Sequence, residues 1–210
     1  MTNSDAPIEG RLFVISAPSG TGKSTVARRV LELEPEMEWS VSYTTRPARE
    51  GEVDGRDYHF IGGDTFDQMV EQGAFLEWAR VFDRRYGTGV ARTREALAAG
   101  RDLLLEIDVQ GAEQVRGSQI ETVSIMILPP DFPTLEARLR GRGSETDDQL
   151  RERLTTARRE AARYEYFDYT VINDDLDRAI EDVRAIVYAE RLRSRRRTST
   201  ITELLKTFPA

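Results

Sequence analysis

A glycine-bearing loop between an apolar run and a helical segment is the feature that most restricts the fold of this sequence. The apolar run at 11–16 (RLFVIS) is short and rich in β-branched residues, as in a strand buried within a parallel sheet. Residues 17–24 follow at once as APSGTGKS, and 25–33 has the apolar spacing of a helix that ends before Pro35. A strand, a glycine loop and a helix in direct succession predict an α/β fold.

The loop matches a pattern that binds nucleoside triphosphates. Gly20, Gly22, Lys23 and Ser24 stand where backbone N–H groups and a helix N-terminus surround phosphates, although the first glycine of the pattern is Ala17 here. Lys23 is predicted to reach the β- and γ-phosphates, and the Ser24 hydroxyl to bind Mg²⁺. A turn that binds nothing is the alternative, and the strand and helix on either side disfavour it. The predicted ATP-binding residues of the loop are Ala17, Pro18, Ser19, Gly20, Thr21, Gly22, Lys23, Ser24 and Thr25.

Further strands and helices alternate along the chain. Apolar runs at 103–107 and 123–128 are separated by helical patterns, and a short run at 169–172 precedes the last long helix. Strands separated by helices favour right-handed crossovers and a three-layer α/β fold with a parallel sheet.

Two stretches depart from this alternation. Residues 41–90 favour β-structure, with strands expected at 42–46, 58–61 and 75–82 and glycines at the turns. Residues 133–164 are rich in arginine and contain two helical segments on either side of Gly141-Arg-Gly143. In the second segment, a single apolar face is expected from Leu150, Leu154, Ala157 and Ala161.

Carboxylates at the end of the run at 103–107 are candidates for the metal site. Glu106 and Asp108 alternate with Ile107 and therefore share one face at the C-terminal end of the predicted strand. Asp108 is assigned to Mg²⁺ together with Ser24. For Asp108 the role of N-cap of a helix beginning near Val109 is an equal alternative.

Composition excludes several classes of protein. The chain has no cysteine and one histidine, His59, which excludes disulfides and thiol catalysis and argues against a multi-histidine zinc site or a Ser/His/Asp triad. No apolar run approaches the ~18 residues of a membrane span, and residues 1–10 lack the features of a secretory signal. A net charge of −7 argues against a general nucleic-acid binder. We therefore expect a cytoplasmic protein without nucleic-acid or membrane partners.

A GTP hydrolase is the first alternative for a chain with such a loop. Asp108-Val-Gln-Gly111 fits the Asp-x-x-Gly motif of those proteins, which read guanine through an Asn-Lys-x-Asp element. Of 30 Lys and Arg residues only Lys23 and Lys206 are lysine, and neither stands in such an element. The scarcity of lysine excludes a GTPase of this type.

A second set of anion-binding groups lies in 42–52 (SYTTRPAREGE), at Tyr58 and at 85–88 (RYGT). Arg46 and Arg49 are three residues apart. Together with tyrosine hydroxyls, they have the chemistry to bind a phosphate monoester through several charge-assisted hydrogen bonds.

This stretch resembles the nucleotide-monophosphate region of guanylate kinases. The resemblance extends over residues 11–190 and is carried by the phosphate loop, Glu77-Trp78, Tyr86-Gly87-Thr88, LEIDVQG at 105–111, GRG at 141–143 and VIND at 171–174. It implies a P-loop kinase fold with a β-rich GMP-binding insertion at about 41–97 and a helical lid at about 133–164. Residues 1–10 are then an N-terminal tail, and 191–210 a basic helix end and tail. The chain departs from the family in that Pro47 comes one position early, which restricts Arg46 toward extended conformations.

The resemblance implies ATP-dependent, Mg²⁺-requiring phosphorylation of GMP and dGMP. It places Arg46, Arg49, Tyr58 and Tyr86 on the GMP phosphate and Ser42, Glu77 and Thr88 on the base. The implied GMP-binding residues are Ser42, Arg46, Arg49, Glu52, Tyr58, Glu77, Tyr86, Gly87, Thr88, Glu106 and Asp108. The implied catalytic residues are Lys23, Arg49 and the lid residues Arg142 and Arg153.

The chemistry of guanine supports the role of Glu77 independently. Guanine offers two adjacent donors, N1–H and the exocyclic amine, beside the O6 acceptor, so a carboxylate can accept from both donors and a hydroxyl can donate to O6. Adenine has an acceptor at N1 and would face the carboxylate with a lone pair. A site of this kind discriminates by about 10⁴ or more.

Some alternatives stay open. Asn173 and Asp174 are placed near the adenine of ATP, but they could instead cap the helix beginning around Asp175. A non-catalytic guanylate-kinase-like interaction domain and a kinase for another phosphorylated acceptor are the rival functions. We expect a monomer or a small homo-oligomer.

Overall fold

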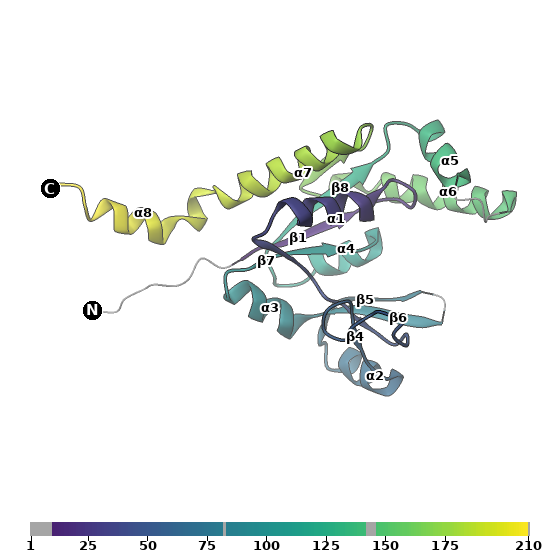
Figure 1. Ribbon diagram of the computed structural model, residues 1–210, viewed down its shortest axis with the longest axis horizontal. Coiled ribbons are helices and arrows are strands. Elements are labelled where there is room, and N and C mark those ends of the chain that lie inside the picture. Colours follow the sequence, from purple (N-terminus) through teal and green to yellow (C-terminus); the bar gives the residue numbers. More distant parts are fainter. Residues whose placement is uncertain (1–9, 82, 142–145, 210) are drawn as a thin grey trace.

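A parallel five-stranded sheet forms the centre of the protein in the computed structural model, which describes residues 10–81, 83–141 and 146–209 (Figure 1). Neighbouring strands are parallel throughout. Across the sheet they follow the order β2 (Met37–Trp39), β7 (Asp102–Glu106), β1 (Leu12–Ser16), β8 (Thr122–Leu128) and β9 (Tyr169–Ile172).

Helices cover both faces of this sheet, and strand β1 divides its side chains between them. Phe13 and Ile15 pack with α1 (Lys23–Leu33) and α7 (Leu176–Arg191). Leu12 and Val14 point to the opposite face and pack with α3 (Val90–Ala98) and α4 (Val109–Arg116). A strand buried on both faces needs a continuous apolar run, which is why this strand could be recognised from sequence. The predicted three-layer α/β fold is confirmed.

A second sheet forms the β-rich insertion. Its strands are β4 (His59–Phe60), β3 (Tyr43–Thr44), β6 (Arg84–Gly89) and β5 (Phe75–Val81), in that order. The insertion also contains helix α2 (Gly63–Glu71), where the sequence indicated only glycine turns. Phe66 of α2 is fully buried and stacks on Phe75 of β5 with ring centroids 4.5 Å apart. The helix therefore covers one end of the small sheet.

The predicted lid contains two helices, α5 (Phe132–Arg140) and α6 (Asp147–Ala161). Asp131 caps α5 by accepting from the Thr134 N–H at 2.7 Å, and Thr146 with Gln149 forms a capping box at the start of α6. Leu150 and Ala157 of the predicted apolar face are buried against Leu135 and Leu139 of α5, and Leu154 packs beside them.

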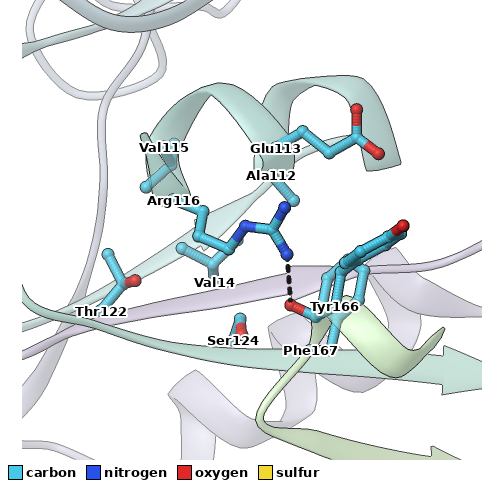
Figure 2. A pocket seen from close by; sticks show the side chains of 9 residues that line it. All are labelled: Val14, Ala112, Glu113, Val115, Arg116, Thr122, Ser124, Tyr166 and Phe167. Atoms are coloured by element: carbon cyan, nitrogen blue, oxygen red, sulfur yellow. Dashed lines mark hydrogen bonds between the residues drawn. The ribbon is translucent and has the colours of Figure 1, made fainter. Parts of the chain in front are cut away.

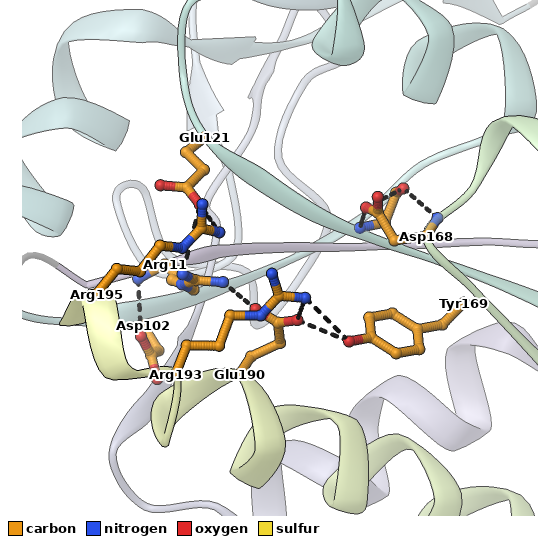
Figure 3. Close-up of polar contacts among 9 residues, drawn as sticks. Arg11, Asp102, Glu121, Asp168, Tyr169, Glu190, Arg193 and Arg195 are labelled. Carbon is orange, nitrogen blue, oxygen red and sulfur yellow. Dashed lines mark hydrogen bonds and ion pairs between the residues drawn. The ribbon is translucent and has the colours of Figure 1, made fainter. Parts of the chain in front are cut away.

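The C-terminal region contains a helix beyond α7, where the resemblance implied a basic helix end and tail. After α7 the chain forms the short 3₁₀ turn η2 (Ser194–Arg196) and then helix α8 (Thr198–Leu205), which extends away from the core (Figure 1). Arginines anchor the segment before α8, because Arg193 pairs with Glu190 at 2.6 Å and Arg195 pairs with Glu121 (Figure 3). Arginines of the run at 191–197 therefore make ion pairs within the protein, while the Arg193 and Arg195 side chains stay exposed.

Candidate active site

The phosphate loop connects β1 to α1 and has the backbone geometry of an anion site. Gly20 and Gly22 have φ of +91° and +90°, which other residues adopt only with strain. Gly22 is the N-cap of α1 and supplies no side-chain capping bond, so no N-cap side chain competes with an anion for the first N–H groups of the helix. Helix α1 begins at Lys23, two residues before the predicted start, and both Lys23 and Ser24 therefore lie in its first turn.

Lys23 and Ser24 meet the end of strand β7. The Lys23 Nζ atom donates to the Ile107 carbonyl at 2.8 Å and lies 3.6 Å from Glu106 Oε1. The Ser24 hydroxyl donates to the same Glu106 oxygen. Burial lowers the pKa of Lys23, and the nearby carboxylates of Glu106 and Asp108 oppose this effect. Glu106 is thus the carboxylate at the end of β7 that contacts Lys23 and Ser24.

Asp108 lies past the end of β7 and caps helix α4. Its Oδ1 accepts a hydrogen bond from the Gly111 N–H at 2.7 Å. This confirms the cap, one of the two roles that the sequence left equal for Asp108, whereas its role toward a metal stays a prediction. Among the residues that the structure describes, no group of three or more His, Cys, Asp or Glu side chains could hold a metal ion.

Arg46 of the small sheet is fixed by Glu52. Its two terminal nitrogens donate to the two Glu52 oxygens at 2.8 Å each, and Glu52 also accepts from the Arg49 N–H at 2.7 Å. These bonds lower the pKa of Glu52 to about 2. The Arg46 guanidinium lies 5.3 Å from the Tyr58 ring centroid. Glu52, predicted to bind GMP, is thus placed to orient the two arginines.

Tyr86 completes this group of residues. The Tyr58 and Tyr86 rings approach each other edge to face with centroids 5.9 Å apart. Arg46, the two tyrosines and the loop that carries Arg49 therefore lie close together, as the resemblance implied. Ser42 immediately precedes β3, and its carbonyl accepts from the His59 N–H at 2.9 Å.

Glu77 and Thr88 face each other across strands β5 and β6. The Thr88 hydroxyl donates to Glu77 Oε1 at 2.7 Å, and only 6% of Glu77 is exposed. Burial raises the pKa of Glu77, a shift that the bond from Thr88 partly opposes. Because a hydroxyl has one proton, Thr88 cannot donate to a guanine O6 while this bond lasts.

Glycines keep space around this carboxylate. A Cβ on Gly111 would lie 3.2 Å from Glu77 Oε2, and one on Gly87 would lie 2.9 Å from the Phe75 ring. Gly87 therefore allows β5 and β6 to pack closely, while Gly111 leaves room for the Glu77 carboxylate.

Asn173 and Asp174 differ in their surroundings. Asn173 is 4% exposed, and its amide Nδ2 donates to the Thr21 carbonyl of the phosphate loop at 2.6 Å. Asp174 is exposed and accepts from the Asp175 N–H at 2.8 Å. Asp175 itself caps α7 through the Arg178 N–H at 2.9 Å. The capping role suggested for Asn173 and Asp174 therefore belongs to Asp175.

The predicted lid contains the predicted residues Arg142 and Arg153, and it also places residues that the sequence did not single out near the phosphate loop. Arg142 lies outside the described residues, and Arg153 is half-buried on α6. Arg138 of α5 donates to the Asn173 carbonyl at 3.1 Å. Glu160 of α6 accepts from the Ser19 N–H, and burial raises its pKa, as does the nearby Asp108. Arg138 and Glu160 stand in a segment with many similar charges and belong to none of the motifs, so only the packing of the helices identifies them.

A separate hollow lies on the sheet face between α4 and η1 (Tyr164–Tyr166) (Figure 2). Arg116 closes one side, donating to the Tyr166 carbonyl at 3.3 Å with its guanidinium 4.7 Å from the Tyr166 ring centroid. The hollow contains no residue of the phosphate loop or of the Arg46 and Glu77 groups. The residues that line it are Val14, Ala112, Glu113, Val115, Arg116, Thr122, Ser124, Tyr166 and Phe167.

Known proteins are similar to this chain in sequence and in fold. The family model described as guanylate kinase matches residues 9–190. Curated guanylate kinases from Syntrophotalea carbinolica and Neisseria meningitidis serogroup B are 50% and 49% identical, covering 89% and 94% of this chain and 89% and 97% of their own. A crystal structure of guanylate kinase from Anaplasma phagocytophilum matches with a TM-score of 0.69 and 32% identity over 91% of each chain. No helix among the described residues is long and apolar enough to cross a membrane.

Proposed function

Because the chain belongs to the guanylate kinase family and phosphorylates GMP with ATP, we propose how its residues divide the reaction between the two nucleotides. The phosphate loop and Lys23 hold the ATP phosphates. The N–H groups at the start of α1 and the Lys23 ammonium neutralise charge on the β- and γ-phosphates, where negative charge gathers during transfer. The pairing of Lys23 with the end of β7 supports this role, because it holds the ammonium beside the loop.

Mg²⁺ fits the oxygen atoms beside the loop. The Ser24 hydroxyl and the Glu106 carboxylate are hard oxygen donors in contact with each other, and Asp108 has a second oxygen beyond its capping bond. We assign Ser24 and Glu106 to the bound Mg²⁺ or its water, with Asp108 close by. Held there by Ser24 and Glu106, Mg²⁺ would supply positive charge that neutralises the ATP phosphates.

Arg46, Arg49, Tyr58 and Tyr86 hold the GMP phosphate. Glu52 supports this role by fixing the Arg46 fork and the Arg49 backbone before the substrate arrives, which lowers the entropy cost of binding. The acceptor is a phosphate oxygen that is already anionic near neutral pH, so transfer needs positioning and charge neutralisation and no general base.

Guanine is read by Glu77, and the observation that carries this proposal is a buried carboxylate held by Thr88 at 2.7 Å. Its free lone pairs can accept from guanine N1–H and the exocyclic amine. Ser42 is assigned to the O6 atom, and Thr88 shares that role only if its hydroxyl turns away from Glu77. The same edge is present in dGMP, so we propose dGMP as a second acceptor.

The lid supplies the remaining cations. Arg142 and Arg153 are assigned to the transferring phosphoryl group, and closure of the lid excludes water, which prevents hydrolysis of ATP. Adenine contacts by Asn173 or Asp174 remain a prediction. A cytoplasmic location, where ATP and GMP are present, is likewise part of the proposal.

An acceptor series tests the reading of guanine. ADP release measured with GMP, dGMP, AMP, CMP and UMP should give kcat/KM for GMP about 10⁴-fold above AMP, because AMP leaves Glu77 facing a lone pair. Equal turnover of AMP and GMP would overturn the role of Glu77. A non-catalytic interaction domain would release ADP with none of them.

Metal removal tests the Mg²⁺ site. EDTA should abolish turnover and added Mg²⁺ should restore it. Glu106→Gln should raise the Mg²⁺ concentration for half-maximal rate by about 10-fold or more, the usual effect of losing a carboxylate near a metal. The control is Glu38→Gln, which alters an exposed pair with Arg101. If Asp108→Asn raised this concentration and Glu106→Gln did not, Asp108 would be the metal carboxylate.

A further inference from the structure

The phosphate loop depends on a residue 152 positions away in the sequence. The Asn173 side-chain amide donates to the Thr21 carbonyl at 2.6 Å, and Thr21 is itself fully buried. The Thr21 hydroxyl in turn donates to the Pro18 carbonyl at 2.6 Å. The loop backbone is therefore held from outside by Asn173 and from within by Thr21.

This contact determines where the next N–H group points. The Thr21 carbonyl and the Gly22 N–H belong to one planar peptide unit, and in a trans peptide they point in opposite directions. A donor that holds the carbonyl on the outer side of the loop therefore aims the Gly22 N–H toward the inner side. Close packing enforces the arrangement, because a Cβ on Gly22 would lie 2.8 Å from Asn173 Nδ2.

Asn173 also connects the loop to the lid. Its backbone N–H donates to the Leu128 carbonyl at 2.8 Å, which continues the pairing of β8 with β9. Its carbonyl accepts from Arg138 Nη2 on α5 at 3.1 Å. Leu139 of the same helix packs against the loop, because a Cβ on Gly20 would lie 2.7 Å from the Leu139 side chain. The sheet, the phosphate loop and the first lid helix thus meet at Asn173.

We propose that Asn173 is a positioning residue that aims the Gly22 N–H at the triphosphate and ties the phosphate loop to α5. The proposal rests on the function proposed above and deepens it. It predicts that Asn173 acts on the phosphates of the donor whatever its base, whereas a residue that reads adenine would act on ATP alone.

Inorganic tripolyphosphate, which has no base, separates the two roles. We would measure its affinity by calorimetry for Asn173→Ala and Asn173→Asp, with the exposed change Gln119→Glu as the matched amide-to-carboxylate control. Loss of one oriented hydrogen bond should weaken binding by about 3- to 10-fold in Asn173→Ala. Asn173→Asp should weaken it further, because a carboxylate would face the Thr21 carbonyl. Gln119→Glu should bind like the wild type.

Kinetics with two donors complete the test. In Asn173→Ala, kcat/KM should fall by the same factor for ATP and for CTP at saturating GMP, while the Kd for GMP stays unchanged. Unchanged tripolyphosphate affinity, with a loss confined to ATP, would overturn the proposal in favour of adenine reading. Weakened GMP binding in the same variant would also overturn it, since that indicates general damage to the fold. The calorimetry needs no turnover, so it stands even if the proposed division of the reaction fails.

Discussion

Glu77→Gln should lower kcat/KM for GMP by at least about 10²-fold while leaving the protein as stable as the wild type or more so. Glutamine keeps the shape and can still accept from Thr88, but its amide presents a donor to one of the two guanine donors. Burial makes the ionised form of Glu77 costly in the folded protein, and for that reason its pKa is raised. A neutral glutamine avoids this cost, so the variant should be at least as stable as the wild type. Steady-state kinetics and thermal unfolding measure the two effects.

The pH dependence of kcat/KM in the wild type and in Glu77→Gln gives a second test. A raised pKa means that Glu77 takes up its proton at a higher pH than an ordinary glutamate, whose pKa is about 4.3. The acid limb of kcat/KM for GMP should therefore include this protonation in the wild type and lack it in Glu77→Gln, while the titration of the GMP phosphate affects both equally. Identical acid limbs would contradict a role for ionised Glu77.

The sign of the stability effect follows from the same shift. Because the folded pKa lies above the unfolded one, the contribution of Glu77 is fully present at low pH and is lost as pH rises through the folded pKa. The wild type should therefore lose stability relative to Glu77→Gln over that interval. A variant that is less stable than the wild type at neutral pH would show that the carboxylate is needed for folding.

Thr88→Val separates the positioning of Glu77 from guanine recognition. Valine removes the 2.7 Å bond but leaves the carboxylate in place, so the loss in kcat/KM should be smaller than for Glu77→Gln. If the two losses were equal, the Thr88 hydroxyl would have a direct part in binding guanine beyond its bond to Glu77.

The parts of the fold that could be predicted are those with buried faces. Strands β1 and β7 bury side chains on both faces of the sheet, so each contains a continuous apolar run. Strand β2 was missed because only Met37 of its three residues is buried. Helix α2 was missed because Gly62 and Gly63 indicated a turn and the helix buries only Phe66. Short elements at the edge of a domain bury too little to leave a pattern.

The site divides in the same way. The glycines of the phosphate loop could be recognised because the backbone requires positive φ at Gly20 and Gly22. The alternation of Glu106 and Asp108 places both on one face of an extended chain, and it could not decide between a metal role and an N-cap role for Asp108. The structure shows the cap, because β7 ends at Glu106 and Asp108 falls at the N-cap of the next helix, while the role of Asp108 toward a metal stays a prediction. The contact of Asn173 with Thr21 joins distant segments, and no local pattern indicates it.

Glu190→Ala should destabilise the protein by about 3–5 kcal/mol, the usual cost of removing one partner of a buried ion pair. Glu190 is 1% exposed and pairs with Arg11, which is 4% exposed, where α7 meets the start of β1 (Figure 3). Glu190 also accepts from the Tyr169 hydroxyl at 2.7 Å. Urea denaturation measures the change in the free energy of unfolding. The Tm should fall by about 10 °C for a chain of this length.

Two further variants show whether the ion pair itself is responsible. Glu203→Ala removes a carboxylate that pairs with Lys206 on the exposed surface of α8, and it should cost no more than about 1 kcal/mol. The double variant Arg11→Met with Glu190→Leu should recover most of the lost stability, because the two apolar side chains leave no buried unpaired charge and Arg193, which also loses Glu190, is 48% exposed. If the double variant were as unstable as Glu190→Ala, the other contacts of Glu190, with the Tyr169 hydroxyl at 2.7 Å and with Arg193 at 2.6 Å, would carry the stability.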